Sequence, residues 1–221
     1  MFLLHETHSV IGRLEDEFEE AIRDEWLAAL AKGDDARLLY FTHLAHGSGP
    51  SYHVVTYTLL RDAAAWGRLV ARVHGGDLTS LVVKLDGMRH DVVAKQLLPL
   101  PWSVVQEIPF EEVPTEPGQH ELSVFMEDTV WPYEGLLEDY IERAGAQYAM
   151  DYDESFPDTP RLVEIQAAYR TAFGSHQRRE ILLWQKVLEP QGLLNLLIEE
   201  MPKEYKQPGR WMLDGLQLRD Q

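Results

Sequence analysis

The pattern of apolar and polar residues over the first thirty positions predicts a strand followed by a helix. A first strand is expected over residues 2–9, which run from apolar Phe2, Leu3 and Leu4 to polar residues. From Leu14 to Leu30, apolar residues recur every three or four positions, with acidic residues between many of them. This spacing is typical of an amphipathic helix. We expect the helix to end at Gly33, because glycine commonly follows a helix C-terminus.

The residue pattern in the rest of the first half predicts a hairpin, two helical stretches and a closing strand. Strands are expected at 38–45 and 52–60, on either side of a turn that contains glycine and proline. Asp62 is expected to cap the helix that follows. A further helical stretch is predicted over 78–98, and a fourth strand over 102–108.

The second half repeats this order of elements. It follows a segment rich in proline and acidic residues, 109–118, which we interpret as a surface linker. The predicted elements are strands at 121–127, 162–173, 179–188 and 211–218, a helix that starts at Pro132, and a helix over 192–201.

A match between the two halves supports the repeat. Displacing the sequence by 127 positions lays residues 44–70 on residues 171–197 without a gap, and Tyr57 then meets Trp184. A match at a fixed period indicates a duplicated structural unit. Each half has the order β-α-β-β-α-β of a ferredoxin-like unit.

These elements predict an α+β chain of two tandem ferredoxin-like units. The expected boundaries are 1–108 for the first unit, 109–118 for the linker and 119–221 for the second unit. A ferredoxin-like unit carries helices on one face of its sheet, so the other face needs a cover. We therefore expect the two sheets to pack against each other as an intramolecular α/β barrel. A homodimer through the outer sheet edges is left open.

One long run of the first half resembles a known family. The run ARLLYFTHLAHGSGPSYHVVTYTLLRDAAAWGRLV is similar to the NIPSNAP-like branch of the dimeric α/β-barrel superfamily, through Gly49-Pro50, Val54-Val55 and Asp62. The later run LLPLPWSVVQEI resembles the closing segment of that family. The resemblance implies the fold. It leaves the activity open, because the superfamily includes cofactor-independent monooxygenases, isomerases, haem enzymes and non-catalytic members.

The residues that usually mark the family's third strand do not carry over to this chain. The family has a histidine and a tryptophan two positions apart on that strand. Here those positions fall on Thr56 and Thr58, or on Val55 and Tyr57. In the second half, Trp184 is the one plausible counterpart.

Composition narrows the classes of partner. The chain has 221 residues, 45% of them hydrophobic, a net charge of −17 and no cysteine. The acidity disfavours nucleic acid and anionic membranes, which attract basic surfaces. No basic leader and no apolar run of about 20 residues is present. We therefore expect a cytoplasmic protein with a small-molecule substrate and with neither a nucleic-acid nor a membrane partner.

Strand alternation separates the two faces of each predicted hairpin. One face collects large aromatic and ionisable side chains, as in the wall of a cavity, and the other collects smaller aliphatic residues that suit packing under helices. A register slip of one residue would exchange the faces. The predicted cavity face carries Tyr40, His53 and Tyr57 in the first half, and Tyr169, Glu180 and Trp184 in the second.

His53 is the predicted general base, because histidine, with an ordinary pKa of about 6.5, can exchange protons near neutrality. Glu180, at the equivalent position in the second half, is its predicted partner. Tyr57 and Tyr169 are predicted to polarise a substrate oxygen. The predicted substrate contacts are Tyr40, His43 and Trp184. The alternative is that His53 is only a hydrogen-bonded strand histidine near the mouth of the hairpin. If His53→Ala keeps wild-type turnover, the base is sought next at His43, on the opposite face.

No metal site and no organic cofactor are expected. The segment His5-Glu6-Thr7-His8 does not match the HExxH zinc motif, and on a strand its two histidines point to opposite faces. Haem is left open, since one axial histidine in an apolar pocket would suffice.

The sequence therefore predicts a small-molecule enzyme of specialised or catabolic metabolism. It would use acid/base chemistry on an aromatic or polyketide-like substrate, by cyclisation, isomerisation, elimination or cofactor-free oxygenation. The alternatives are a haem-dependent enzyme or haem-binding protein, and a non-catalytic binding or accessory protein.

Overall fold

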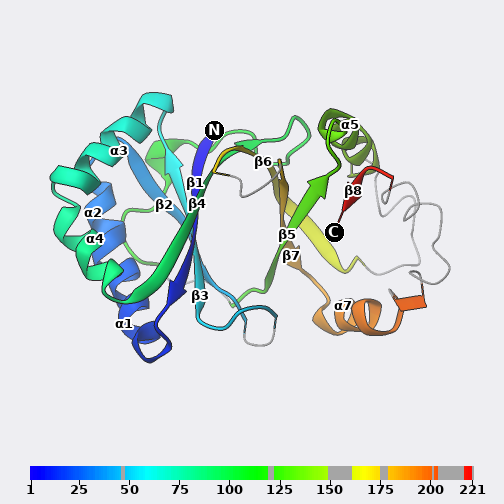
Figure 1. Ribbon diagram of the computed structural model, residues 1–221, viewed down its shortest axis with the longest axis horizontal. Helices are drawn as coiled ribbons and strands as arrows, with labels where there is room; N and C mark the ends of the chain where they lie inside the picture. The colour runs from blue at the N-terminus through cyan, green and yellow to red at the C-terminus, as the bar shows by residue number, and fades with distance from the viewer. Residues whose placement is uncertain are drawn as a thin grey trace. The chain divides into compact units, whose positions relative to one another are not determined.

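The computed structural model describes residues 1–45, 48–118, 122–148, 161–174, 179–200, 202–203 and 217–220. The chain is α+β, as expected, and divides into two compact units (Figure 1). Unit 1 comprises Met1–Leu98, Glu107–His120 and Ala172–Gly174, and unit 2 comprises Pro99–Gln106, Glu121–Thr171 and Ser175–Gln221.

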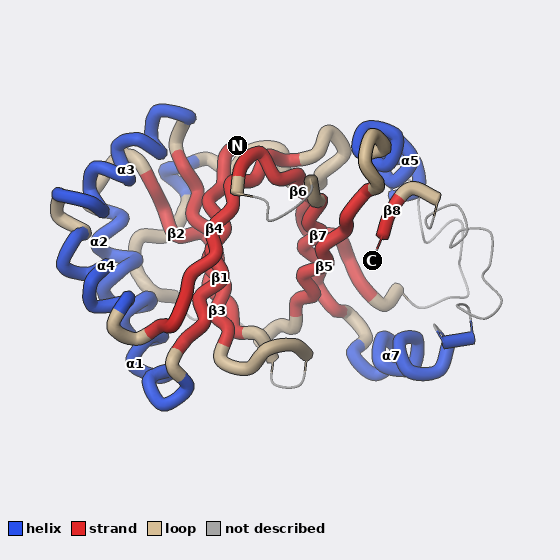
Figure 2. The backbone as a smooth tube through the Cα atoms, viewed as in Figure 1, coloured by secondary structure: helices blue, strands red, loops and turns tan. Residues whose placement is uncertain are grey.

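Unit 1 is a four-stranded antiparallel sheet with helices over one face (Figure 2). The strand order β2-β3-β1-β4 is that of a ferredoxin-like unit. Its elements are β1 (Phe2–Val10), η1 (Gly12–Leu14), α1 (Glu15–Glu20), the π-helical turn η2 (Ala21–Trp26), α2 (Leu27–Ala31), β2 (Ala36–His43), β3 (His53–Leu60), α3 (Ala63–Gly75), α4 (Thr79–Asp86), β4 (Arg89–Pro99) and η3 (Phe110–Glu112).

The core of unit 1 lies between the sheet and these helices. The amphipathic stripe predicted from the sequence supplies its helical side, with Phe18, Ile22 and Leu30 each at most 1% exposed. Val54 and Leu60 of β3 supply the sheet side. Asp62 caps α3 as predicted, because its carboxylate accepts a hydrogen bond from the Ala65 amide at 2.7 Å.

The predicted helix over 78–98 is wrong beyond α4. That helix ends at Asp86, and Arg89–Pro99 forms strand β4, which pairs with β1. The apolar positions in this stretch fit a helical period and a strand period equally well. Pairing with the free edge of β1 decides between them, since strand preference depends strongly on cross-strand neighbours.

The fourth strand predicted over 102–108 is also wrong, because β4 already occupies that place in the sheet. The segment instead has a turn at Trp102 and irregular structure over 103–108, with residues 102–106 in unit 2 and 107–108 in unit 1. The Trp102 indole N–H donates to the Ile141 carbonyl at 2.8 Å, and the Ser103 hydroxyl accepts from the Ala168 amide at 2.9 Å.

Unit 2 has the same strand order, β6-β7-β5-β8, with antiparallel pairs β6–β7, β5–β7 and β5–β8. Pro132 ends a strand and does not open a helix, and the predicted last strand falls mostly outside the described residues. The elements are β5 (Phe125–Pro132), α5 (Leu137–Tyr148), β6 (Val163–Phe173), β7 (Ile181–Val187), α7 (Pro190–Asn195), the π-helical turn η4 (Leu196–Glu200) and β8 (Arg219–Asp220).

The two hairpins share a cross-strand register. Tyr40 pairs with Tyr57 in unit 1, and Ala167 pairs with Trp184 in unit 2. The sequence match superimposes Tyr57 on Trp184, and the same displacement of 127 positions takes Tyr40 to Ala167. Each hairpin also has a β-bulge immediately before that pair. The bulges lie between Leu38 and Tyr40 and between Ile165 and Ala167.

The linker expected over residues 109–118 and the expected unit boundaries remain predictions. Part of the segment packs on unit 1, because Phe110 is buried between two arginines. The guanidinium carbons of Arg37 and Arg61 lie 4.2 and 4.1 Å from the centre of its ring. Arg61 also donates to Glu111 at 2.8 Å.

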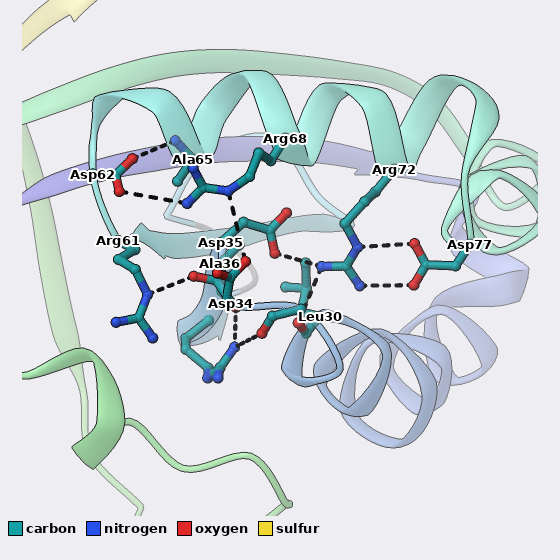
Figure 3. A network of polar contacts seen from close by, with 12 residues as sticks. Leu30, Asp34, Asp35, Ala36, Arg61, Asp62, Ala65, Arg68, Arg72 and Asp77 are labelled. Carbon is teal, nitrogen blue, oxygen red and sulfur yellow. Dashed lines mark hydrogen bonds and ion pairs between the residues drawn. The ribbon is translucent and has the colours of Figure 1, made fainter.

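A polar network joins α3 to the end of α2 and the start of β2 (Figure 3). Arg72 donates to Asp35 at 2.7 Å, to both oxygens of Asp77 at 3.0 Å, and to the Ala29 carbonyl at 2.7 Å. The last bond gives a second donor to a carbonyl in the last turn of α2, which also accepts from the Lys32 amide at 3.3 Å. Asp35 is 1% exposed, and its second oxygen has no hydrogen bond within the described structure. Arg72 is therefore its main counter-charge.

Replacing Arg72 by Met should lower the free energy of unfolding by roughly 3–5 kcal/mol, because it leaves the buried Asp35 charge uncompensated. Arg68→Met, on the same helix, is the matched control. Arg68 is 42% exposed and lies 3.6 and 3.8 Å from its carboxylates, so its loss should cost less than about 1 kcal/mol. Urea unfolding measures both variants, and equal effects would contradict the account.

Candidate functional site

The face of the unit 1 sheet that points away from the helices gathers polar and aromatic side chains. Cross-strand partners share a face, and the register pairs Ser9 with His53, His5 with Tyr57, and Tyr57 with Tyr40. The division of faces expected from the sequence is therefore observed in unit 1.

His53 is held by a hydrogen bond at each ring nitrogen. Nδ1 lies 2.9 Å from the Pro50 carbonyl oxygen, and Nε2 lies 2.8 Å from the Ser9 hydroxyl. A carbonyl only accepts, so Nδ1 must carry a proton. In the neutral ring, Nε2 is then the acceptor, and the Ser9 hydroxyl donates to it. This arrangement leaves the basic nitrogen of His53 facing a serine.

The turn before β3 positions the Pro50 carbonyl. Tyr52 adopts a left-handed conformation, with φ of 60°, and its carbonyl accepts from the Val10 amide at 2.9 Å. Its ring lies over Gly12, where a Cβ atom would come within 2.7 Å of the ring. A glycine at position 12 therefore lets the turn close against the end of β1, beside Ser9.

Tyr57 and His5 form the buried part of this face. Tyr57 is fully buried, and its ring meets His5 edge-on at 4.8 Å and Tyr40 edge-on at 5.9 Å. Burial raises the pKa of Tyr40, so its hydroxyl stays protonated and can donate to a substrate oxygen. Ser9 and His53 are partly exposed and mark the accessible end of the face. The catalytic role predicted for Tyr57 stays a prediction.

His43 is not brought together with this group. It pairs with Val54, so it lies on the helix-facing side of the sheet. Its ring lies 2.8 Å from a Glu19 oxygen and 3.8 Å from a Glu15 oxygen of α1. Its predicted contact with substrate remains untested, and its observed partners are these helix carboxylates.

The predicted residues of the second half lie in unit 2, on the face of its sheet away from α5. Glu180 is 8% exposed and accepts from the Trp131 indole at 3.1 Å and the Thr171 hydroxyl at 3.3 Å. Trp184 stacks on Phe125, with ring centres 4.9 Å apart, and Tyr169 is buried. Because these residues and His53 belong to different units, the pairing of His53 with Glu180 stays a prediction.

A second polar cluster, which the sequence interpretation missed, lies on the helix-facing side of unit 1. Arg89 donates to His8 Nδ1 at 2.6 Å and to Asp86. His8 Nε2 lies 3.0 Å from the Thr56 hydroxyl. Because arginine only donates, His8 Nδ1 must accept, and Nε2 carries the proton of a neutral ring.

Burial governs the ionisation of this cluster. It lowers the pKa of His8 to about 3, with the charges of Arg89 and His5 acting in the same direction. It raises the pKa of Glu6, against the pull of Arg89. The available signal was strand geometry, because Glu6 and His8 share a face of the predicted first strand with Phe2 and Leu4, which pack on the helix-facing core.

The described ranges contain neither a candidate metal site nor a candidate membrane-spanning helix. In that part of the chain, no group of three or more histidine, aspartate or glutamate residues could hold a metal ion. No helix there has the length and apolar character needed to cross a bilayer.

No model of a protein family and no curated protein matches the sequence. Among solved structures, the chain is similar to an anthrone oxidase-like protein, with 9% identity over 90% of this chain and 77% of that one and a TM-score of 0.53. A putative monooxygenase from Lactobacillus acidophilus is similar over 93% of this chain and 85% of its own, with 9% identity and a TM-score of 0.51. At these identities the likeness shows the fold.

The chain is also similar to solved NIPSNAP-domain structures, the family that a run of its first half resembles. An uncharacterized NIPSNAP domain protein from Burkholderia xenovorans matches 46% of this chain and 96% of its own, with 18% identity and a TM-score of 0.40.

The neutral state of His8 predicts a pH-dependent contribution to stability. The unfolded chain binds a proton at this residue below about pH 6.5, whereas the folded chain does so only near pH 3. The stabilisation is therefore complete above pH 6.5 and is lost toward pH 3, by about 1.4 kcal/mol per pH unit. The stability of wild type minus that of His8→Asn should fall with pH across this window, as measured by urea unfolding.

Glu6, Asp86 and Arg89 are present both in the wild type and in His8→Asn. Their own titration therefore cancels to first order when the stability of the variant is subtracted from that of the wild type. His74→Asn, at an exposed position of α3, should show no such trend. A difference between wild type and His8→Asn that stays constant from pH 6.5 to pH 3.5 would contradict the neutral, buried His8.

Proposed function

We propose that the protein is a small-molecule enzyme that transfers a proton on an aromatic or polyketide-like substrate, with His53 as the general base. The observation that carries the proposal is the fixed tautomer of His53. The bond from Nδ1 to the Pro50 carbonyl leaves Nε2 as the proton acceptor, at the accessible end of its face. A base oriented in this way can take a proton from a phenol, an enol or an activated carbon.

Aromatic and hydroxyl-bearing side chains on the same face support an aromatic substrate. The protonated hydroxyl of Tyr40 can donate to a carbonyl that gains charge during proton removal. In this proposal, Tyr57 and Tyr169 polarise the same substrate oxygen. The stacked Trp184–Phe125 pair provides a flat wall, and Glu180 acts as the second acid/base group.

Among cyclisation, isomerisation, elimination and cofactor-free oxygenation, we place cofactor-free oxygenation first. Two proteins of similar fold carry the names anthrone oxidase-like and putative monooxygenase, which supports this choice. We propose that the reaction needs no organic cofactor and that the protein acts in the cytoplasm on a small molecule, without a nucleic-acid or membrane partner. The net charge of −17 supports the absence of nucleic acid.

We also propose that the two units arose by duplication and close their sheets into one intramolecular α/β barrel. The shared strand order, the shared register and the bulges at matching positions support this origin. In such a barrel, the faces that carry His53 and Glu180 would line one cavity.

Replacing His53 by Ala should lower turnover by roughly 10²–10⁴-fold, because a positioned base is lost. The assay is oxygen uptake and product formation with a panel of anthrones and polycyclic phenols. His74→Ala is the matched control and should keep wild-type activity, because this histidine is exposed on α3. Urea unfolding checks that both variants fold. Wild-type turnover in His53→Ala would refute the assigned base, and a Soret band in the purified protein would point to a haem enzyme instead.

A further inference from the structure

We propose that Ser9 is a nucleophile activated by His53, so that this site also cleaves activated esters through an acyl-serine intermediate. An activated serine is recognised by a base within hydrogen-bond reach and a third group that orients the base. Both conditions hold here. The Ser9 hydroxyl lies 2.8 Å from His53 Nε2, and the Pro50 carbonyl lies 2.9 Å from His53 Nδ1.

A local irregularity of the sheet singles out Ser9. The pairing of β1 with β4 shifts register between Ser9 and Val10, whose partners are Asp91 and Arg89. His90 is thus an extra residue on β4 at this point. Bulges of this kind redirect side chains and are frequent next to active sites. Ser9 is also partly exposed, so a substrate can reach its hydroxyl.

The chemistry requires only the ester and water. The Ser9 oxygen attacks the ester carbonyl carbon while its proton moves to His53 Nε2. The bond from the carbonyl carbon to the leaving oxygen breaks, and the leaving alcohol takes that proton. Water then attacks the acyl-serine, passing one proton through His53 back to the Ser9 oxygen, and the carboxylic acid leaves. The Pro50 carbonyl holds Nδ1–H throughout and stabilises the imidazolium.

The charge near Ser9 defines the substrate class. Asp91 is the cross-strand partner of Ser9 on β4, and it is exposed. Its carboxylate opposes an anionic acyl group at the same end of the face. The substrate class is therefore a neutral or cationic activated ester. The inference does not depend on the aromatic substrate proposed above, because it can be tested with a probe that needs only the serine and its base.

The test treats the full chain with a fluorophosphonate probe and, separately, with p-nitrophenyl acetate, and maps the adduct by mass spectrometry. The expected result is one adduct, on Ser9, formed roughly 10²–10⁴-fold more slowly in His53→Ala. The matching loss-of-adduct variant is Ser9→Ala. If that variant does not fold, the position of the adduct on the wild-type protein still identifies the nucleophile. Ser48→Ala is the matched control and should label normally, because Ser48 is exposed in the nearby turn and donates to the Ala45 carbonyl at 2.6 Å.

Two results would overturn the proposal. One is folded wild-type protein that forms no adduct on Ser9, and the other is a Ser9 adduct that forms equally fast in His53→Ala. For the substrate class, p-nitrophenyl acetate should react faster than the anionic p-nitrophenyl succinate, and Asp91→Asn should reduce that preference. A preference unchanged in Asp91→Asn would overturn the assigned class.

Discussion

The register of β1 against β3 is the constraint on which the rest of unit 1 depends. It places Ser9 opposite His53 on one face and His8 opposite Val54 on the other. Because side chains alternate along a strand, a slip of one residue would exchange these faces. The polar site would then lie under the helices, and core residues such as Val54 would leave the helix–sheet core. One set of backbone hydrogen bonds therefore determines both the packing of the unit and its chemistry.

Polar groups inside unit 1 are tolerated because they have hydrogen-bond partners there. His8 stays neutral, since burial penalises its charged form and the neighbouring Arg89, which needs Nδ1 as an acceptor, is itself positively charged. Asp35 is buried beside Arg72, which also binds the end of α2. His53, at the accessible end of the other face, is also held by hydrogen bonds. There the Pro50 carbonyl, in place of a carboxylate, fixes the tautomer of the ring.

Much of the fold could be predicted from periodicity, and much of the site could not. Periodicity located the first amphipathic helix and the face that carries His53 and Tyr57, and a turn that contains glycine and proline located β2 and β3 on either side of it. Periodicity failed over 78–98, because spacing alone cannot separate a short helix and a strand from one longer helix. Ser9 and the Pro50 carbonyl were missed for a different reason. Their contacts with His53 depend on strand pairing across 44 residues and on a left-handed turn residue, and neither leaves a pattern in composition.

The tautomer of His53 tests the account most directly. Nitrogen-15 NMR of histidine-labelled protein at neutral pH, assigned with His53→Ala, distinguishes a protonated from an unprotonated ring nitrogen. The account predicts a protonated Nδ1 and an unprotonated Nε2 whose resonance changes in Ser9→Ala, because Ser9 donates to that atom. A ring protonated at Nε2, or one that averages freely between the two tautomers, would contradict it.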